Sequence, residues 1–145
     1  MIGDIVRVNK DVSVPKDTIV EIRGIDADNA FLKRNLKGSV DCVPYGGFDI
    51  TYGVWVEYLD PIPLSAEFFE KNGWYHVDTD NDTKRFYTCD ENFEMTAHEF
   101  NDGKWHIEYD CIEMGCIPIQ CVNIGWVYEL QHFFKQCGVE RKLKI

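Results

Sequence analysis

The sequence lacks the long apolar run of a membrane-spanning helix, because no stretch approaches the roughly 20 consecutive apolar residues that a bilayer requires. The first residues, MIGDIVRV, also lack the basic start and following apolar stretch of a secretory signal. We therefore expect a soluble cytoplasmic protein with no membrane partner.

Positive charge is scarce, with 15 Lys and Arg against 25 Asp and Glu and a net charge of -10 at pH 7. Sequence-independent nucleic-acid binding depends on neutralising phosphates, so this excess argues against nucleic acid as a partner. The acidic residues are dispersed rather than arrayed, which argues against a nucleic-acid mimic. Two small basic clusters are candidate phosphate contacts or, more commonly, solvated surface: Lys33-Arg34 with Lys37, and Arg141-Lys142 with Lys144.

The usual catalytic signatures are missing: the sequence has no phosphate-binding loop, dinucleotide fingerprint, His-Glu-x-x-His or Gly-x-Ser-x-Gly. We therefore predict no catalytic residue and no cofactor. One alternative stays open, a small hydrolase or nucleotide-modifying enzyme whose site forms only in space. Its site would be a carboxylate pair, or Cys42 with His76 or His98.

The sequence also contains no Cys-x-x-Cys pair among its six cysteines. Cys111, Cys116 and Cys121 are five residues apart, and a turn at Met114-Gly115 would place them on two strands of a hairpin. A zinc-stabilised structural module is therefore a further alternative. Free cysteine is more often a small buried hydrophobe, so we predict core positions and no metal.

The first third of the chain reads as short strands joined by turns. We predict strands over residues 4–8 and 17–25, then a turn over 26–29 that leads into residues 30–34. A further strand runs from Val54 to about Asp60, and Pro61 must end it or push it to an edge. Short strands without a helix predict a small SH3-like β-barrel over residues 1–62.

A second module is predicted over residues 63–145, beginning with a short helix. Ser65 is a suitable N-cap, Leu64 can pack on Phe69, and Gly73 can end the helix. Strands then begin at Trp74, Lys84, Phe93, Lys104 and Cys116, and the short connections predict an antiparallel meander of about five strands. The predicted fold class is α+β: the barrel, a helix, the meander and a C-terminal helix.

The segment KWHIEYD alternates, so Trp105, Ile107 and Tyr109 are expected on a buried face, and His106 and Glu108 on a face that meets water or a partner. The loop DTDNDT, residues 78–83, starts like a calcium loop. It lacks the glycine and the glutamate that such a loop needs at its sixth and twelfth positions, so we predict a hydrated hairpin tip.

The closing helix carries Glu129 and His132 three residues apart, a spacing typical of one half of a di-metal site. Such a site needs a second Glu-x-x-His helix, which the sequence does not contain. We therefore predict a solvated helix face, with Asn123 capping the start of the helix and Gly138 its end.

The segment CVPYGGFDITYGVW, residues 42–55, holds four aromatic residues in a glycine-interrupted loop. Such a loop can present rings that stack on a base, a peptide or a proline-rich segment. The alternative is that the rings close the barrel or its contact with the second module. The predicted ligand- or partner-binding residues are Tyr45, Phe48, Tyr52 and Trp55.

Three segments resemble a family of uncharacterised small two-module proteins of gut Bacteroidetes and their phages: IGDIVRV, LDPIPLSAEFFEKNGW and GWVYELQHFFKQCGVE. The resemblance implies a strand module, a PIPL helix start and a YVHxLQN-like final helix, and it carries no activity. His132, Cys137 and the cysteine run depart from that pattern. A phage or mobile-element origin follows as an expectation, in a bacterial or phage-infected cell.

Together these observations predict a non-catalytic binding protein. Its partner would be a host protein, or a small nucleotide-like ligand that it sequesters. Sequestering proteins are often homo-oligomers with the ligand at a subunit interface, so self-association is part of this prediction.

Overall fold

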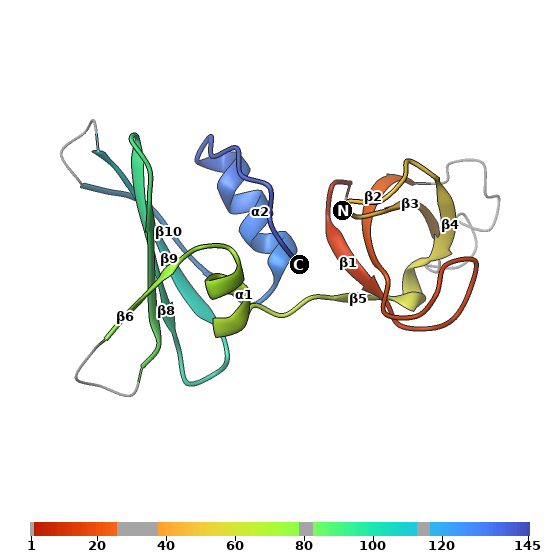
Figure 1. The fold of residues 1–145 in the computed structure, drawn as a ribbon, viewed down its shortest axis with the longest axis horizontal. Coiled ribbons are helices and arrows are strands. Elements are labelled where there is room, and N and C mark those ends of the chain that lie inside the picture. The colour runs from red at the N-terminus through yellow and green to blue at the C-terminus, as the bar shows by residue number, and fades with distance from the viewer. Residues whose placement is uncertain (1, 26–37, 79–82, 113–116) are drawn as a thin grey trace. The chain divides into compact units, whose positions relative to one another are not determined.

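The computed structural model describes residues 2–25, 38–78, 83–112 and 117–145. These residues form an α+β fold with two antiparallel five-stranded sheets and two α-helices (Figure 1). The chain divides into two compact units, unit 1 over Met1–Ile62 and unit 2 over Pro63–Ile145, each with its own sheet.

Unit 1 contains one sheet with the strand order β4-β3-β2-β1-β5, all neighbours antiparallel. The predicted first two strands are confirmed. The predicted turn and strand over residues 26–34 lie outside the described residues. The strand bounds are Ile5–Val8 for β1, Ile19–Ile25 for β2, Ser39–Pro44 for β3, Tyr52–Trp55 for β4 and Leu59–Pro61 for β5.

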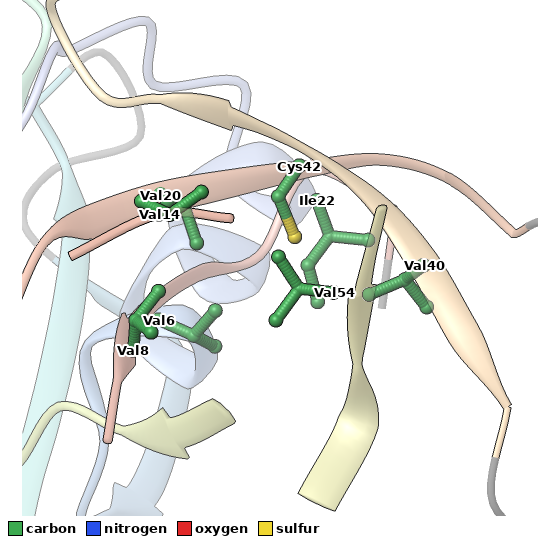
Figure 2. Close-up of a cluster of buried hydrophobic side chains, with 8 residues drawn as sticks. All are labelled: Val6, Val8, Val14, Val20, Ile22, Val40, Cys42 and Val54. Carbon is green, nitrogen blue, oxygen red and sulfur yellow. The ribbon is translucent and has the colours of Figure 1, made fainter. Parts of the chain in front are cut away.

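The sheet of unit 1 curls around an aliphatic core, and Figure 2 shows its side chains pointing toward one another from β1 to β4. These strands are rich in valine, whose branched side chain packs well on a pleated surface. Tyr52, Tyr58 and Leu59 are partly buried and pack against the cluster. The cluster consists of Val6, Val8, Val14, Val20, Ile22, Val40, Cys42 and Val54.

The prediction of one strand from Val54 to Asp60 is wrong for Val56–Tyr58. The backbone leaves β4 after Trp55, makes a 3-10 turn, η2, over Val56–Tyr58, and re-enters the sheet as β5. The Tyr58 carbonyl accepts a hydrogen bond from the Asn9 amide at 2.9 Å, and the Lys10 ammonium lies 4.8 Å from the centre of the Tyr58 ring. The turn lets the chain cross to the opposite edge, where β5 pairs with β1 and ends at Pro61, as a strand with proline at an edge should.

Unit 2 opens with α1, Ala66–Lys71, whose predicted ends are confirmed. The Ser65 hydroxyl oxygen accepts a hydrogen bond from the Phe68 amide at 3.1 Å, which satisfies one of the free N–H groups of the first turn. Leu64 and Phe69 are both buried. Gly73 has a φ of +76°, the left-handed conformation that ends the helix.

The predicted meander of five antiparallel strands is confirmed, in the order β10-β9-β8-β7-β6. Its tight connections use the expected turn residues: the Asp90 carboxylate accepts from the Asn92 amide at 2.8 Å, and Gly103 has a φ of +77°. The bounds are Tyr75–Val77 for β6, Arg85–Cys89 for β7, Phe93–Glu99 for β8, Trp105–Cys111 for β9 and Ile117–Ile124 for β10.

Both helices lie on the same side of this sheet (Figure 1). The Phe69 ring of α1 lies at the centre of an aromatic cluster, 4.6 Å from the Trp105 ring, 4.9 Å from Trp74 and 5.5 Å from Phe86. The other helix, α2 (Val127–Gln136), buries Val127, Leu130, Phe133 and Phe134. The opposite face of the sheet is covered by neither helix.

The predicted N-cap of α2 is wrong, because Asn123 belongs to β10, which continues to Ile124. Trp126 holds the cap position, and Glu129 supplies the acceptor. Its carboxylate accepts from the Gly125 amide at 2.8 Å and from the Trp126 amide at 3.1 Å. At the other end, Gly138 has a φ of +70° and ends the helix as predicted.

The last residues return from α2 to the end of α1. The Asn72 side chain donates to the Lys144 carbonyl and accepts from the Lys144 amide, each at 2.8 Å. The Leu143 side chain is buried. Arg141 donates to the Thr88 hydroxyl at 2.9 Å and lies 5.8 Å from the centre of the Phe93 ring. This segment therefore belongs to the helical layer of unit 2. Within the described residues, no helix has the length and apolar character needed to cross a bilayer.

Candidate binding surfaces

The aromatic segment predicted to bind a partner forms the β3–β4 hairpin of unit 1. Tyr45 follows β3 directly, is half-buried, and donates its backbone amide to the Ile19 carbonyl at 2.9 Å. Phe48 lies at the tip and is 87% exposed. Gly46 has a φ of +73°, which lets the backbone turn after Tyr45. The Ile50 amide then donates to the Phe48 carbonyl at 2.8 Å.

The other two predicted residues, Tyr52 and Trp55, point to opposite faces of the sheet. Directly opposite residues share a face, and successive residues alternate. Tyr52 pairs with Cys42 and packs on the core, whereas Trp55 pairs with Ser39 on the outer face and is 38% exposed. The structure therefore does not bring the four aromatic residues together as one cluster.

Ile50 joins Phe48 as an apolar side chain of the hairpin tip, with 52% of its surface exposed. We call Phe48 and Ile50 the hairpin tip. Ile50 is not among the predicted binding residues, because the prediction rested on aromatic side chains alone. The signal that could have found it is its position two residues from Phe48 in the same glycine-bearing loop.

The second candidate surface is the face of the β6–β10 sheet that neither helix covers, which we call the open face. The predicted alternation of KWHIEYD is confirmed, since Trp105 and Ile107 are buried while His106 and Glu108 point to the open face. The register places neighbouring polar side chains in rows across the strands. One row is Val77, Arg85, His98, His106 and Asn123; the next is Tyr75, Tyr87, Thr96, Glu108 and Cys121.

His106 is held on both sides at the centre of the open face. Its Nδ1 lies 2.6 Å from the Asn123 Oδ1, and its Nε2 lies 3.2 Å from the Glu108 Oε1. An ionised carboxylate can only accept, so Nε2 is the donor in that contact, and Nδ1 faces the side-chain amide of Asn123. The Thr96 hydroxyl donates to the other Glu108 oxygen at 3.3 Å. This network fixes both the ring and the carboxylate.

The row beyond Thr96 and Glu108 contains two carboxylates, because Glu94 and Asp110 are directly opposite each other. Burial raises the pKa of Asp110, and the negative charges of Glu108 and Glu94 raise it further. The Asp110 Oδ1 is buried and has no hydrogen-bond partner among the residues that the structure describes. The neighbouring Cys89, burial and the neighbouring Glu94 raise the pKa of Tyr87.

Within the described residues, no group of three His, Cys, Asp or Glu side chains is arranged to hold a metal ion. Cys111 faces the helices and Cys121 faces the open side, because Cys121 pairs with Glu108. These two cysteines therefore cannot ligate one ion, and Cys116 lies outside the described residues. Of the proposed calcium loop, Asp80 and Asp82 also lie outside them.

The Cys42 thiol belongs to the unit 1 core, with 0% of its surface exposed. Burial raises the pKa of this thiol to about 11, and the charge of Asp41 contributes. The thiolate is the nucleophilic form, so Cys42 is a packing residue in this structure. Glu129 is engaged as a helix cap, and His132 lies on the exposed part of α2 with its ring 6.0 Å from that of Tyr128.

The structure describes one of the two basic clusters. Lys33, Arg34 and Lys37 lie outside the described residues. Arg141 is engaged by Thr88 and Phe93, as described above. Comparison of the chain with protein-family models, curated proteins and solved structures found no match.

Proposed function

We propose that the chain is a non-catalytic binding protein that docks a partner protein through the hairpin tip of unit 1. The observation that carries this proposal is Phe48, a large apolar side chain that is 87% exposed at the end of a short hairpin. The hairpin itself is anchored, because β3 and β4 pair over four residues and the Val56 amide donates to the Gly38 carbonyl at 2.9 Å. A projecting ring on an anchored hairpin can enter an apolar pocket without reorganising the protein.

The removal of apolar side chains from water would supply the binding free energy at the hairpin tip. Burying a phenylalanine or isoleucine side chain contributes about 2 kcal/mol each, so Phe48 and Ile50 together can anchor an interface. Their surroundings are polar, with Asp49 between them and Thr51 after them. A central apolar anchor with a polar rim is the usual composition of a protein–protein contact. The resemblance to proteins of Bacteroidetes and their phages supports a bacterial host protein as the partner.

The finer fold assignment of unit 1, an SH3-like barrel, is part of this proposal. It is supported by five short strands curled around one aliphatic core and by the 3-10 turn between β4 and β5. Within the described residues the two edge strands do not pair with each other, so the sheet is open. Small barrels of this class commonly bind peptides through aromatic surfaces.

The test is site-specific crosslinking in cells. The photoreactive residue benzoylphenylalanine would replace Phe48 in one variant and Phe100 in a matched one, since Phe100 is an exposed phenylalanine of a turn in unit 2. We expect a discrete adduct from position 48 and none from position 100. The adduct partner, once purified, should bind the wild-type chain and lose at least tenfold in affinity with Phe48→Ala and Ile50→Ala combined.

Ile2→Ala is the control for that binding measurement, because Ile2 is an exposed aliphatic residue of the same unit. It should leave the affinity unchanged. If the partner binds the double variant as tightly as the wild type, or if position 100 gives the same adduct, the hairpin tip is not the docking site.

A further inference from the structure

A second surface, on unit 2, holds two nitrogen donors for which the described residues offer no acceptor. Arg85 in β7 and His98 in β8 are directly opposite each other on the open face, and both are half-buried. Within the described residues no hydrogen bond or ion pair satisfies either side chain. A guanidinium always carries its charge and five N–H groups, so this pair presents donors and positive charge to solvent.

The groups around His98 leave room for an additional negative charge beside it. Burial lowers the pKa of His98, and the positive charge of Arg85 and the neighbouring His106 lower it further, while Glu108 acts in the opposite direction. Glu108 is itself engaged by Thr96 and His106. An anion placed between Arg85 and His98 would accept a hydrogen bond from both and would favour the protonated form of His98.

An aromatic pair lies one row away on the same face. Tyr75 in the edge strand β6 is directly opposite Tyr87, and Tyr75 is 69% exposed. Cys89 and Glu94, which are directly opposite each other, lie one row beyond Tyr87 on the same face. Tyr87 is two positions from Arg85 along β7, which corresponds to roughly 7 Å. Tyrosine rings are the surface on which a nucleobase stacks.

We propose that the β6–β8 part of the open face binds a mononucleotide, with its phosphate between Arg85 and His98 and its base on Tyr75. This site is separate from the hairpin tip and does not depend on the docking function proposed above. The ligand is a mononucleotide rather than a nucleic-acid strand for two reasons. The surface offers one guanidinium and one imidazole, enough for a single phosphate, and the net charge of -10 repels a polyanion.

Calorimetric titration of the full chain with adenosine 5′-monophosphate, adenosine and inorganic phosphate tests the proposal. We expect the monophosphate to bind more tightly than either fragment. Arg85→Gln should weaken monophosphate and phosphate binding at least tenfold and leave adenosine binding unchanged. Tyr75→Ala should weaken monophosphate and adenosine binding several-fold and leave phosphate binding unchanged.

Lys84→Gln is the matched control, because Lys84 precedes Arg85, is exposed, and pairs with Glu99 at 3.7 Å instead of facing the site. It should leave monophosphate binding unchanged, and circular dichroism should show that all three variants are folded. The proposal is overturned if the monophosphate does not bind at millimolar concentration, or if Lys84→Gln weakens it as much as Arg85→Gln. Tighter binding of an eight-nucleotide single strand than of the monophosphate would also overturn it.

Discussion

The two units build their cores from different side chains. Unit 1 fills its core with valine, isoleucine and Cys42, and leaves Phe48 and Trp55 in contact with solvent. Unit 2 builds its core around aromatic rings, with Phe69, Phe86 and Trp105 in mutual contact, and leaves a largely polar sheet face on which Tyr75 is exposed. The difference indicates what each unit can bind, since unit 1 offers an apolar projection and unit 2 a surface of donors and carboxylates.

The largest test of this comparison makes the same substitution in both units. Phe69→Ala should destabilise unit 2 by about 3–5 kcal/mol, because it removes a fully buried ring that contacts four other aromatic side chains. Phe48→Ala should change the free energy of unfolding by less than about 0.5 kcal/mol, since its ring is exposed. Urea denaturation followed by tryptophan fluorescence measures both, because the buried Trp74 and Trp105 report on unit 2 and Trp55 of β4 reports on unit 1. A loss above 2 kcal/mol for Phe48→Ala would mean that the tip is a packing element.

Cys42→Ser tests the aliphatic core of unit 1. The substitution should lower the free energy of unfolding by about 1–3 kcal/mol, because it buries a hydroxyl without a hydrogen-bond partner. The exposed Cys121→Ser is the control and should be near neutral. Because burial raises the pKa of the Cys42 thiol to about 11, a thiol reagent at pH 8 should label Cys121 quickly and Cys42 only after unfolding. Equal labelling rates in the folded protein would contradict a closed core in unit 1.

The helical layer is a second difference between the units, and Glu129 shows how unit 2 maintains it. Glu129→Ala should destabilise unit 2 by about 1 kcal/mol, because the Gly125 and Trp126 amides lose their acceptor. His132→Ala, one turn further along α2, should change the free energy of unfolding by less than about 0.5 kcal/mol. Thermal denaturation monitored by circular dichroism separates the two roles. Equal losses for both variants would revive the idea of a functional Glu129–His132 pair.

Local patterns predicted most of the fold, and non-local pairing explains what they missed. The ends of α1 followed from Ser65 and Gly73, whose roles depend on neighbouring residues only. The alternation in KWHIEYD likewise placed His106 and Glu108 on the correct face. The pairing of Arg85 with His98, however, depends on how two strands align, and no single strand carries that information. The Asn123 cap failed for the same reason, because β10 continues through that residue to pair with β9.

The smallest change in the free energy of unfolding is expected at Asp110, on the open face of unit 2. Burial and the charges of Glu94 and Glu108 raise the pKa of this carboxyl, so its charged form is less stable in the folded than in the unfolded chain. Asp110 therefore reduces stability at neutral pH and has no such effect at pH 3, where it is protonated in both states. Asp110→Asn should stabilise the protein by up to about 1 kcal/mol at pH 7, and the gain should disappear as the pH falls to 3. Urea denaturation at several pH values measures this gain, with the exposed Asp49→Asn of unit 1 as the control. A gain that persists at pH 3 would show that packing, and not the repulsion among carboxylates on the open face, sets the effect.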